Sequence, residues 1–447
     1  MNNKRQRRFA VLAGGLVALL GLQTAIAQEE GSAAAQGDAS PAVQGESPSA
    51  PLGEGSSAAL GDDSRSPFSF SVSQTFRYDS NVRSRPDDSV YAKYGANVPK
   101  DRSDTLSVTR AGANFDGVMG RQAFHAGLDL SHTIYNKHSD LNNTSGDANL
   151  RWDWRLGDRW SGILGYRYGE SFVDFGDTYT NVTTAERGRL TRRLGRANAS
   201  ADFWWHPNWA TGFGFSDVRS DYRNNDRPRE EYNAQEVSLN FTYRPSTGNR
   251  IVLSLRAEEG EYPNQDKAPG SMREWERRDA RLSGHWQLSG VTQLSGYAGY
   301  TQRKYEWASN RDFSGVTGKI AFRWTPTGKA IINLSWRREI GADADAVSNF
   351  AVSHGWTLEP TWVITSKVRL GASFEHLKRN YRGDPGLGWT THPRDAKTTS
   401  YGANLSYLPV PSANITLGYR HHKRDTQNFD YLSYKGWATW LSGSLTF

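Results

Sequence analysis

Apolar and polar residues alternate position by position through much of the chain from Pro67 onward. In segment 236–244, valine, leucine, phenylalanine and tyrosine fill the odd positions, and glutamate, serine, asparagine, threonine and arginine fill the even ones. The same phase recurs at 319–324, 332–337 and 415–420. A period of two is typical of a pleated strand that has one apolar face and one polar face.

The last segment, 432–447, continues this alternation to the end of the chain, with Trp437, Leu441, Leu445 and Phe447 on one face. A terminal phenylalanine after such a strand resembles the C-terminal signature of bacterial outer-membrane β-barrels, which their assembly machinery reads. Phe447 is therefore the candidate assembly signal, and the barrel assembly machinery and outer-membrane lipid are the implied partners. The alternative is the final edge strand of a soluble β-protein.

Two kinds of connection alternate between these segments. Short ones, rich in Gly, Pro, Asn and Asp, have the residues that tight turns require. Longer polar ones lie between them, as expected of outer-membrane barrels with short periplasmic turns and long outer loops. Eight turns and nine loops predict an all-β, antiparallel transmembrane barrel of about 18 strands, within a range of about 16 to 20. The short turns fall at 119–121, 157–159, 206–208, 245–249, 289–290, 326–329, 365–366 and 409–412.

The N-terminal part has a different composition. Residues 1–27 resemble a secretory signal peptide, because basic residues precede a short apolar run and an Ala-Ile-Ala sequence precedes the cleavage point between Ala27 and Gln28. Residues 28–66 are rich in Gly, Ser, Ala, Pro and acid, so we expect a disordered periplasmic tail. The barrel then spans 67–447. An uncleaved anchor helix is the alternative for the first segment.

Mean hydropathy is −0.71 although aromatic residues make up 12% of the chain. After the leader, no apolar run approaches the roughly 18 residues of a membrane helix. A barrel with a polar lumen and an apolar outer belt accounts for both observations. Tryptophans near the short turns are predicted to form an interfacial girdle, and scattered surface aromatics of a soluble sandwich are the alternative. The girdle candidates are Trp204, Trp205, Trp209, Trp286, Trp324 and Trp362.

Position parity also predicts the lumen lining. About eighteen strands leave an interior too wide for side chains to fill, so a channel or a plugged lumen is expected. Arginine dominates the predicted wall, and its planar fork holds carboxylates and phosphates. Pairing of arginines with acids merely to stiffen the wall is the alternative. The candidates are Arg77, Arg151, Arg155, Arg167, Arg192, Arg196, Arg244, Arg256, Arg281, Arg323, Arg337, Arg369, Arg420, Glu236, Glu258 and Glu375.

No residue pattern indicates catalysis, a metal site or a cofactor. His421 and His422 are adjacent in a strand and point to opposite faces, so they cannot share one metal ion in the wall. Asp343 and Asp345 lack the remaining ligands of a calcium loop. We therefore expect a non-enzyme without a metal or cofactor, and no nucleic-acid partner.

The opening strand runs into a Tyr-Asp-x-Asn-Val-x-Arg sequence, with Tyr78, Asp79, Asn81 and Arg83 at its fixed positions. This motif resembles the EpsL-like or porin-2-like outer-membrane barrels that are encoded with exopolysaccharide biosynthesis genes. The resemblance implies a conduit for a secreted polysaccharide that receives its substrate from a periplasmic polysaccharide export protein. The alternative function is a general or anion-selective diffusion porin, and a scaffold, an adhesin or an enzyme is a further alternative.

Overall fold

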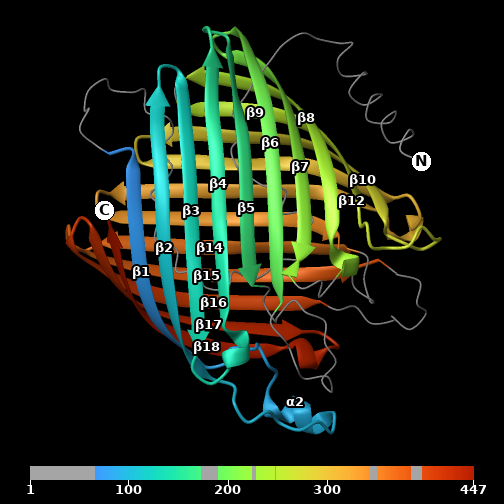
Figure 1. Ribbon diagram of the computed structural model, residues 1–447, viewed down its shortest axis with the longest axis vertical. Coiled ribbons are helices and arrows are strands. Elements are labelled where there is room, and N and C mark those ends of the chain that lie inside the picture. Colours follow the sequence, from blue (N-terminus) through green and yellow to red (C-terminus); the bar gives the residue numbers. More distant parts are fainter. Residues whose placement is uncertain (1–65, 173–189, 224–227, 247, 343–349, 384–394) are drawn as a thin grey trace.

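The computed structural model describes residues 66–172, 190–223, 228–246, 248–342, 350–383 and 395–447. The predicted signal peptide, the cleavage residues Ala27 and Gln28, and the acidic tail apart from Ser66 lie outside these residues. In the described part, eighteen strands pair antiparallel with their sequence neighbours to form one sheet (Figure 1). The predicted fold class and strand number are confirmed.

Strand lengths run from 12 to 16 residues. About 9 to 11 tilted residues suffice to cross lipid, so the strands are longer than a bilayer requires. In chain order they are β1 (Phe68–Asp79), β2 (Asp104–Met119), β3 (Gln122–Tyr135), β4 (Asn143–Leu156), β5 (Trp160–Phe172), β6 (Thr191–His206), β7 (Trp209–Tyr222), β8 (Tyr232–Ser246), β9 (Asn249–Glu261), β10 (Glu274–Ser289), β11 (Thr292–Tyr305), β12 (Phe313–Thr327), β13 (Ala330–Ala342), β14 (Phe350–Val363), β15 (Val368–Arg382), β16 (Ala396–Val410), β17 (Ala413–Thr426) and β18 (Tyr434–Thr446).

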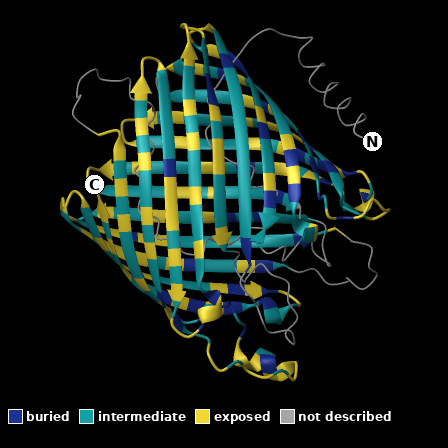
Figure 2. Cartoon of the chain, viewed as in Figure 1, coloured by how far each residue is buried: buried dark blue, intermediate teal, exposed yellow. Residues whose placement is uncertain are grey.

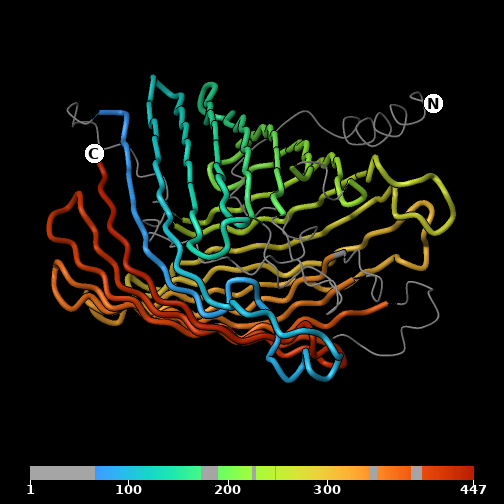
Figure 3. The backbone as a smooth tube through the Cα atoms, turned by 60° about the horizontal axis from the view of Figure 1, so that its bottom comes forward, coloured from blue at the N-terminus to red at the C-terminus, as the bar shows by residue number. Residues whose placement is uncertain are grey.

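The sheet closes because β1 pairs with both β2 and β18. Ser71 lies opposite Thr446, and Phe447 exchanges backbone hydrogen bonds of 2.8 and 3.1 Å with Phe70. The first strand and the last therefore run side by side, with the start of β1 and the end of β18 at the same end of the barrel (Figure 3). Closure removes the free edges that a sheet in lipid could not satisfy.

The short connections lie where the turn residues predicted them, all at the end of the barrel that carries the chain ends. Gly120 and Gly157 both have φ of +61° and Gly248 has φ of +83°, a left-handed conformation that glycine adopts without a steric penalty. These turns join consecutive strands with only a few intervening residues. In outer-membrane barrels, the end with the short turns is the periplasmic one.

The opposite end carries short helices that the strand-by-strand prediction missed. Helix α2 (Asp88–Lys93) lies in the first long loop and buries Tyr91. Asp88 in its first turn and Lys93 in its last turn suit the helix dipole, but a helix this short leaves no helical period in the sequence. Single 3₁₀ turns lie in other loops: η2 (Ser139–Leu141), η5 (Pro228–Glu230), η6 (Ser309–Arg311) and η7 (Asp430–Leu432). None of the helices in the described residues is long and apolar enough to cross a membrane.

Exposed apolar residues recur at alternate positions on the outside of the barrel (Figure 2). Ile320, Leu417 and Leu441 are each more than half exposed, and their neighbours in sequence face the interior. Of the predicted girdle, Trp205, Trp209, Trp286, Trp324 and Trp362 are exposed.

Trp204 departs from the girdle prediction. Its indole ring lies 4.3 Å below the guanidinium of Arg244, on the face opposite to that of Trp205. The prediction treated all tryptophans near a short turn alike. Two consecutive strand residues necessarily point to opposite faces, so only one of this pair can join an outer girdle.

Candidate functional site: the arginine-rich inner face

The candidate site is the inner face of the barrel, where polar residues alternate with the exposed apolar ones. Every predicted lining residue lies within a strand of the barrel. For example, Arg337 follows exposed Trp336, Arg369 precedes exposed Leu370, and Arg420 follows exposed Tyr419. The alternation therefore sets all these side chains on the inner face, and they differ mainly in their partners.

One group of inner arginines contacts acids or hydroxyls on its own or a neighbouring strand. Arg77 pairs with Asp79 at 2.5 Å, and Arg151 makes two hydrogen bonds of 2.7 and 2.8 Å to Asp153. Arg192 donates to the hydroxyl of Ser220 at 2.8 Å and Arg196 to that of Ser216 at 3.3 Å, while Arg167 is the cross-strand neighbour of Arg196.

Two inner arginines, Arg244 and Arg281, stack on aromatic rings, and the contact of Arg244 with Trp204 is described above. The guanidinium of Arg281 lies 4.1 Å from the centroid of Tyr297. Such cation–π contacts hold the planar group flat against the wall. These two side chains are fixed in place by the barrel itself.

Glu375 on β15 lies between two arginines. Its carboxylate is 3.5 Å from the guanidinium of Arg337 on β13 and 3.8 Å from that of Arg420 on β17. Intervening strands β14 and β16 have Gly355 and Gly402 beside these residues, and neither glycine has a side chain to separate them. Glu375 therefore contacts two bases at once.

A buried ionic cluster lies toward the loop end of β8 to β10. The side chain of Arg277 is only 3% exposed and contacts Asp279 at 2.8 Å, Glu258 at 3.5 Å and Glu236 at 3.6 Å. Trp275 donates its indole N–H to Glu258 at 3.2 Å. Three carboxylates surround one guanidinium, so Glu236 and Glu258 serve this cluster.

Arg303 on β11 adjoins this cluster and is fully buried. Its guanidinium lies 4.2 Å from the ring centroid of Trp275 and 5.1 Å from that of Tyr305. Among the described residues, none accepts a hydrogen bond from its Nε, Nη1 or Nη2. Burial of an unsatisfied guanidinium is costly, and the two aromatic faces offset part of that cost.

Parity could have found both buried arginines. Arg277 lies four residues before Arg281 on β10 and therefore on the same face. Arg303 on β11 lies opposite Arg277 and points to that face too. Neither residue was among the predicted lining residues, although both lie within predicted strands. No sequence signal distinguishes these two buried positions from the solvent-facing arginines, since burial depends on neighbouring strands and loops.

For four inner arginines, no hydrogen bond, ion pair or ring contact of the guanidinium is present in the described part of the chain: Arg155, Arg256, Arg323 and Arg369. Arg155 and Arg369 are exposed and lie close to short turns, while Arg256 and Arg323 are half-buried and lie further along their strands. The stiffening alternative predicted that Glu258 would neutralise Arg256. Glu258 contacts Arg277 at 3.5 Å instead, and in the described residues no ion pair joins it to Arg256.

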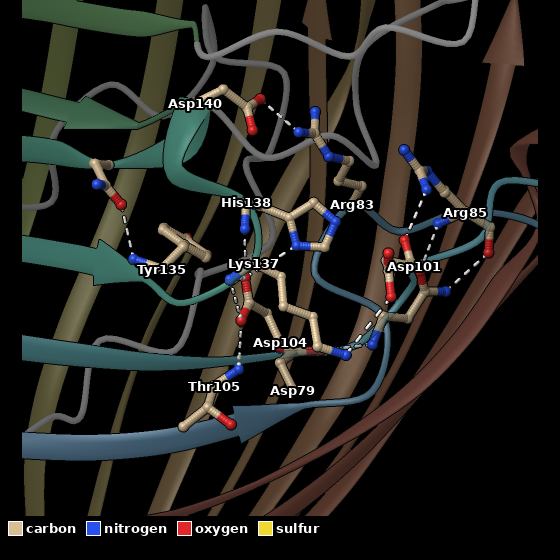
Figure 4. A network of polar contacts seen from close by, with 12 residues as sticks. Asp79, Arg83, Arg85, Asp101, Asp104, Thr105, Tyr135, Lys137, His138 and Asp140 are labelled. Carbon is tan, nitrogen blue, oxygen red and sulfur yellow. Dashed lines mark hydrogen bonds and ion pairs between the residues drawn. The ribbon is translucent and has the colours of Figure 1, made fainter.

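The motif at the end of β1 forms a polar network at the mouth of the barrel (Figure 4). Asp79 accepts a hydrogen bond from the backbone N–H of Asn81 at 2.9 Å, and the Asn81 side chain donates to the carbonyls of Arg85 and Lys435. Arg83 forms an ion pair with Asp140 in the next long loop. These residues therefore fix the first loop against β18 and the second loop.

Asp104 plays the same part at the start of β2. Its carboxylate accepts hydrogen bonds from the backbone of Thr105, Lys137 and His138, and lies 2.9 Å from Nδ1 of the His138 ring (Figure 4). The contacts of the Tyr-Asp-x-Asn-Val-x-Arg motif and of Asp104 are those of a loop clamp.

The two adjacent histidines lie as the alternation predicted. His421 stacks on Tyr401 with ring centroids 4.8 Å apart, whereas His422 lies 5.7 Å from Tyr434 on the other face. In the described residues, no three His, Asp or Glu side chains are arranged to hold a metal ion. Asp343 and Asp345 lie outside the described residues.

Several solved structures are similar to the chain at low sequence identity. The outer membrane protein opdK from Pseudomonas aeruginosa is 11% identical, with a TM-score of 0.45 over 85% of this chain and 99% of that one. A BenF-like porin from Pseudomonas fluorescens Pf-5 is 10% identical, with a TM-score of 0.46 over 85% and 98%. OccAB4 from Acinetobacter baumannii is 9% identical, with a TM-score of 0.44 over 87% and 100%. At this level no substrate is carried over from them.

No curated protein matches the chain. A family model does, and the family is described as "Putative beta-barrel porin 2". The match spans residues 190–438, more than half of the chain, and runs from the start of β6 into β18. It therefore includes most of the strands that carry the inner arginines. The chain belongs to this β-barrel porin family.

Proposed function

We propose that the protein is a passive diffusion pore of a Gram-negative outer membrane that favours small anionic solutes. The observation that carries the proposal is a set of inner arginines whose guanidinium groups have no hydrogen-bond, ion-pair or ring partner in the described part of the chain: Arg155, Arg256, Arg323 and Arg369. A guanidinium with an acid partner is neutralised locally, whereas one without such a partner keeps its charge and its hydrogen-bond donors for a solute. Basic residues lining a pore favour anions.

The width of the barrel supports passage. Barrels of 16 to 18 strands leave an aqueous channel once their inward side chains are placed. The inner wall also holds several arginines flat against aromatic rings or neighbouring strands, so part of its charge is fixed in position. A fixed basic wall concentrates small anions from dilute solution, and this enrichment falls as salt screens it.

Polysaccharide export is the second candidate, and it rests on the resemblance of the Tyr78 to Arg83 motif. Those residues act as a loop clamp in the structure, so their contacts give no support to a polymer substrate. Trp440, an inward aromatic that could stack on a sugar, lies against the wall where a side chain at Gly418 would be. The diffusion-pore proposal therefore has the better support, and a periplasmic export partner stays a prediction.

The test measures ion selectivity in planar bilayers under a KCl gradient. The sign of the reversal potential of the wild-type pore should show that chloride passes more readily than potassium. A triple variant with Arg256→Glu, Arg323→Glu and Arg369→Glu should move that potential toward cation preference. The shift should be larger near 0.01 M salt, where the Debye length is about 30 Å, than near 1 M, where it is about 3 Å.

Arg278→Glu is the matched control, because Arg278 lies on the outer face of β10 with a side chain that is 70% exposed. It should leave the reversal potential unchanged. A cation-selective wild-type pore, or a triple variant with wild-type selectivity, would contradict the proposal. Measuring secreted polymer in cells with the same triple variant tests the second candidate: loss of an acidic polymer at unchanged barrel abundance would favour export.

A further inference from the structure

Basic side chains gather on the outer face of one side of the barrel, at the loop ends of β13 to β18. We call this set the basic face. Its members alternate with residues that point into the barrel, so they point away from the lumen and take no part in the proposed pore. They are Arg338, His354, His376, Lys378, Lys397, Lys423 and Lys435.

A row of outward aromatic residues lies directly below the basic face. Trp336, Trp356, Tyr401, Tyr419 and Trp437 are each 40 to 45% exposed. Several of these rings pack side by side on the surface, as Trp356 does with Phe374 at 4.7 Å and Tyr419 with Trp437 at 6.3 Å. Exposed aromatic rows mark the boundary between hydrocarbon and headgroups in membrane barrels.

The height of the basic face follows from strand geometry. Arg338 is two residues beyond Trp336, His354 is two residues before Trp356, and Lys435 is two residues before Trp437. Each residue of a strand advances about 3.3 Å, so these groups lie roughly 7 Å further toward the loops than the aromatic row. That is the level of lipid headgroups.

The register brings like charges directly opposite one another. Lys378 lies opposite Lys397 across β15 and β16. Lys423 likewise lies opposite Lys435. Directly opposed like charges destabilise a sheet, so a bound anion between them would relieve a cost that the fold otherwise carries.

Acidic residues balance only part of this charge. Lys423 pairs with Asp425 and Lys435 with Asp87, both at 2.9 Å and both solvent-exposed. Asp425 also lies opposite Lys397 across β16 and β17, but in the part of the chain that the structure describes neither Lys378 nor Lys397 forms an ion pair.

The other side of the barrel is different. On the outer face of β5 to β10, basic residues are matched by acids: Arg193 with Asp221, Arg219 with Asp217, Arg223 with Glu170 and Arg278 with Glu276. Among the described residues, outward bases without an ion pair are therefore concentrated at β13 to β18, and Lys304 on β11 is a further one. A generally basic surface would not produce this difference.

We propose that the basic face binds the phosphate groups of a phosphorylated glycolipid in the outer leaflet, with the acyl chains lying on the apolar belt below. Lys378 and Lys397 form the centre of the site, and Lys423 and Lys435 form its flank. Exposed Leu334, Leu370, Leu405 and Leu417 continue the same strands downward and offer the hydrocarbon contact. The inference rests on the proposed membrane location, and it does not depend on what the pore conducts.

The test uses the full barrel folded in detergent and titrated with bisphosphorylated lipid A, with bound lipid counted by native mass spectrometry. A variant with Lys378→Gln, Lys397→Gln, Lys423→Gln and Lys435→Gln should bind at least about tenfold more weakly, since each lysine near a charged lipid surface contributes roughly a factor of five. The matched control carries Arg219→Gln and Arg278→Gln, on the opposite side, and should bind as the wild type does. Lipid A without phosphates should bind weakly to all three proteins.

Two further measurements test the binding even if the glutamine variant fails to fold. Binding of lipid A to the wild type should fall as NaCl rises from 50 to 500 mM, a result that needs no variant to fold. Replacing the same four lysines by arginine should retain binding. The proposal is overturned if the glutamine variant binds like the wild type, if the phosphate-free lipid binds equally well, or if salt has no effect. Reversal potentials of the glutamine variant should equal those of the wild type, so failure here and failure of the pore proposal are distinguishable.

Discussion

Removal of the guanidinium at Arg277 should strongly destabilise the barrel. Three carboxylates contact it, at 2.8, 3.5 and 3.6 Å, and none of the four side chains is more than 12% exposed. At an effective dielectric constant of about 20, a pair of charges at such distances attracts by roughly 5 kcal/mol before desolvation is subtracted. Arg277→Met leaves three buried carboxylates without their cation, so we expect a loss of about 3 to 5 kcal/mol in the free energy of unfolding.

Arg278→Met is the matched control for this experiment. Arg278 is the next residue on the same strand, points outward, and has one contact with Glu276 at 3.6 Å. An exposed pair of this kind contributes at most about 1 kcal/mol. Both variants replace one arginine of β10 by methionine, so they change the strand propensity and the net charge of the protein by the same amount. The difference between them isolates the buried cluster.

Urea unfolding of the barrel in lipid vesicles, followed by tryptophan fluorescence, measures both variants. Trp275 donates to Glu258 within the cluster, so its emission should also shift in the native state of Arg277→Met. Adding Glu258→Gln to Arg277→Met should recover part of the loss, because one uncompensated charge is removed. A loss below about 1 kcal/mol, or one equal to that of Arg278→Met, would refute the reasoning, since water or ions would then be compensating the carboxylates.

The remaining predictions concern the closed sheet and the loops. The barrel should migrate faster on electrophoresis unheated than boiled, because a closed sheet has no edge at which to begin unfolding; an absence of any shift would count against a stable closed barrel. Phe447→Ala should lower the amount of folded barrel in the membrane without lowering synthesis, and normal folded levels would remove its role as an assembly signal. Asp430 is partly buried, which would raise its pKa, but hydrogen bonds from Lys93 and Tyr94 outweigh this and lower it from the ordinary value of 3.8. Because the pKa is lowered, the contribution of Asp430 to docking of α2 on η7 is fully present above pH 3.8 and is lost as the pH falls through the lowered pKa. Exchange of the Tyr94 backbone amide hydrogen should therefore accelerate in that pH range. The Asp430→Asn variant should exchange fast at every pH, and identical exchange in the two proteins would contradict a link between Asp430 and docking.

The sequence by itself determined the barrel. A strand has a strict period of two, so apolar residues such as Ile320 and Leu417 could be assigned to the outer face without any knowledge of their neighbours. Turn residues such as Gly120 and Gly157 need a left-handed backbone, so they marked the short connections locally. Both signals depend only on adjacent residues, which is why the strand number could be predicted.

The partners of the side chains were decided by tertiary structure alone. Register across strands brings Arg277 among carboxylates of β8, β9 and β10, and it gives Glu258 to Arg277 rather than to Arg256, two residues away in sequence. The same register brings Lys378 opposite Lys397, residues that lie in different strands joined by a long loop. Alternation specifies the face of a residue but not its height relative to the next strand. Which arginines contact acids and which lysines lie opposite one another therefore follow only from the closed barrel.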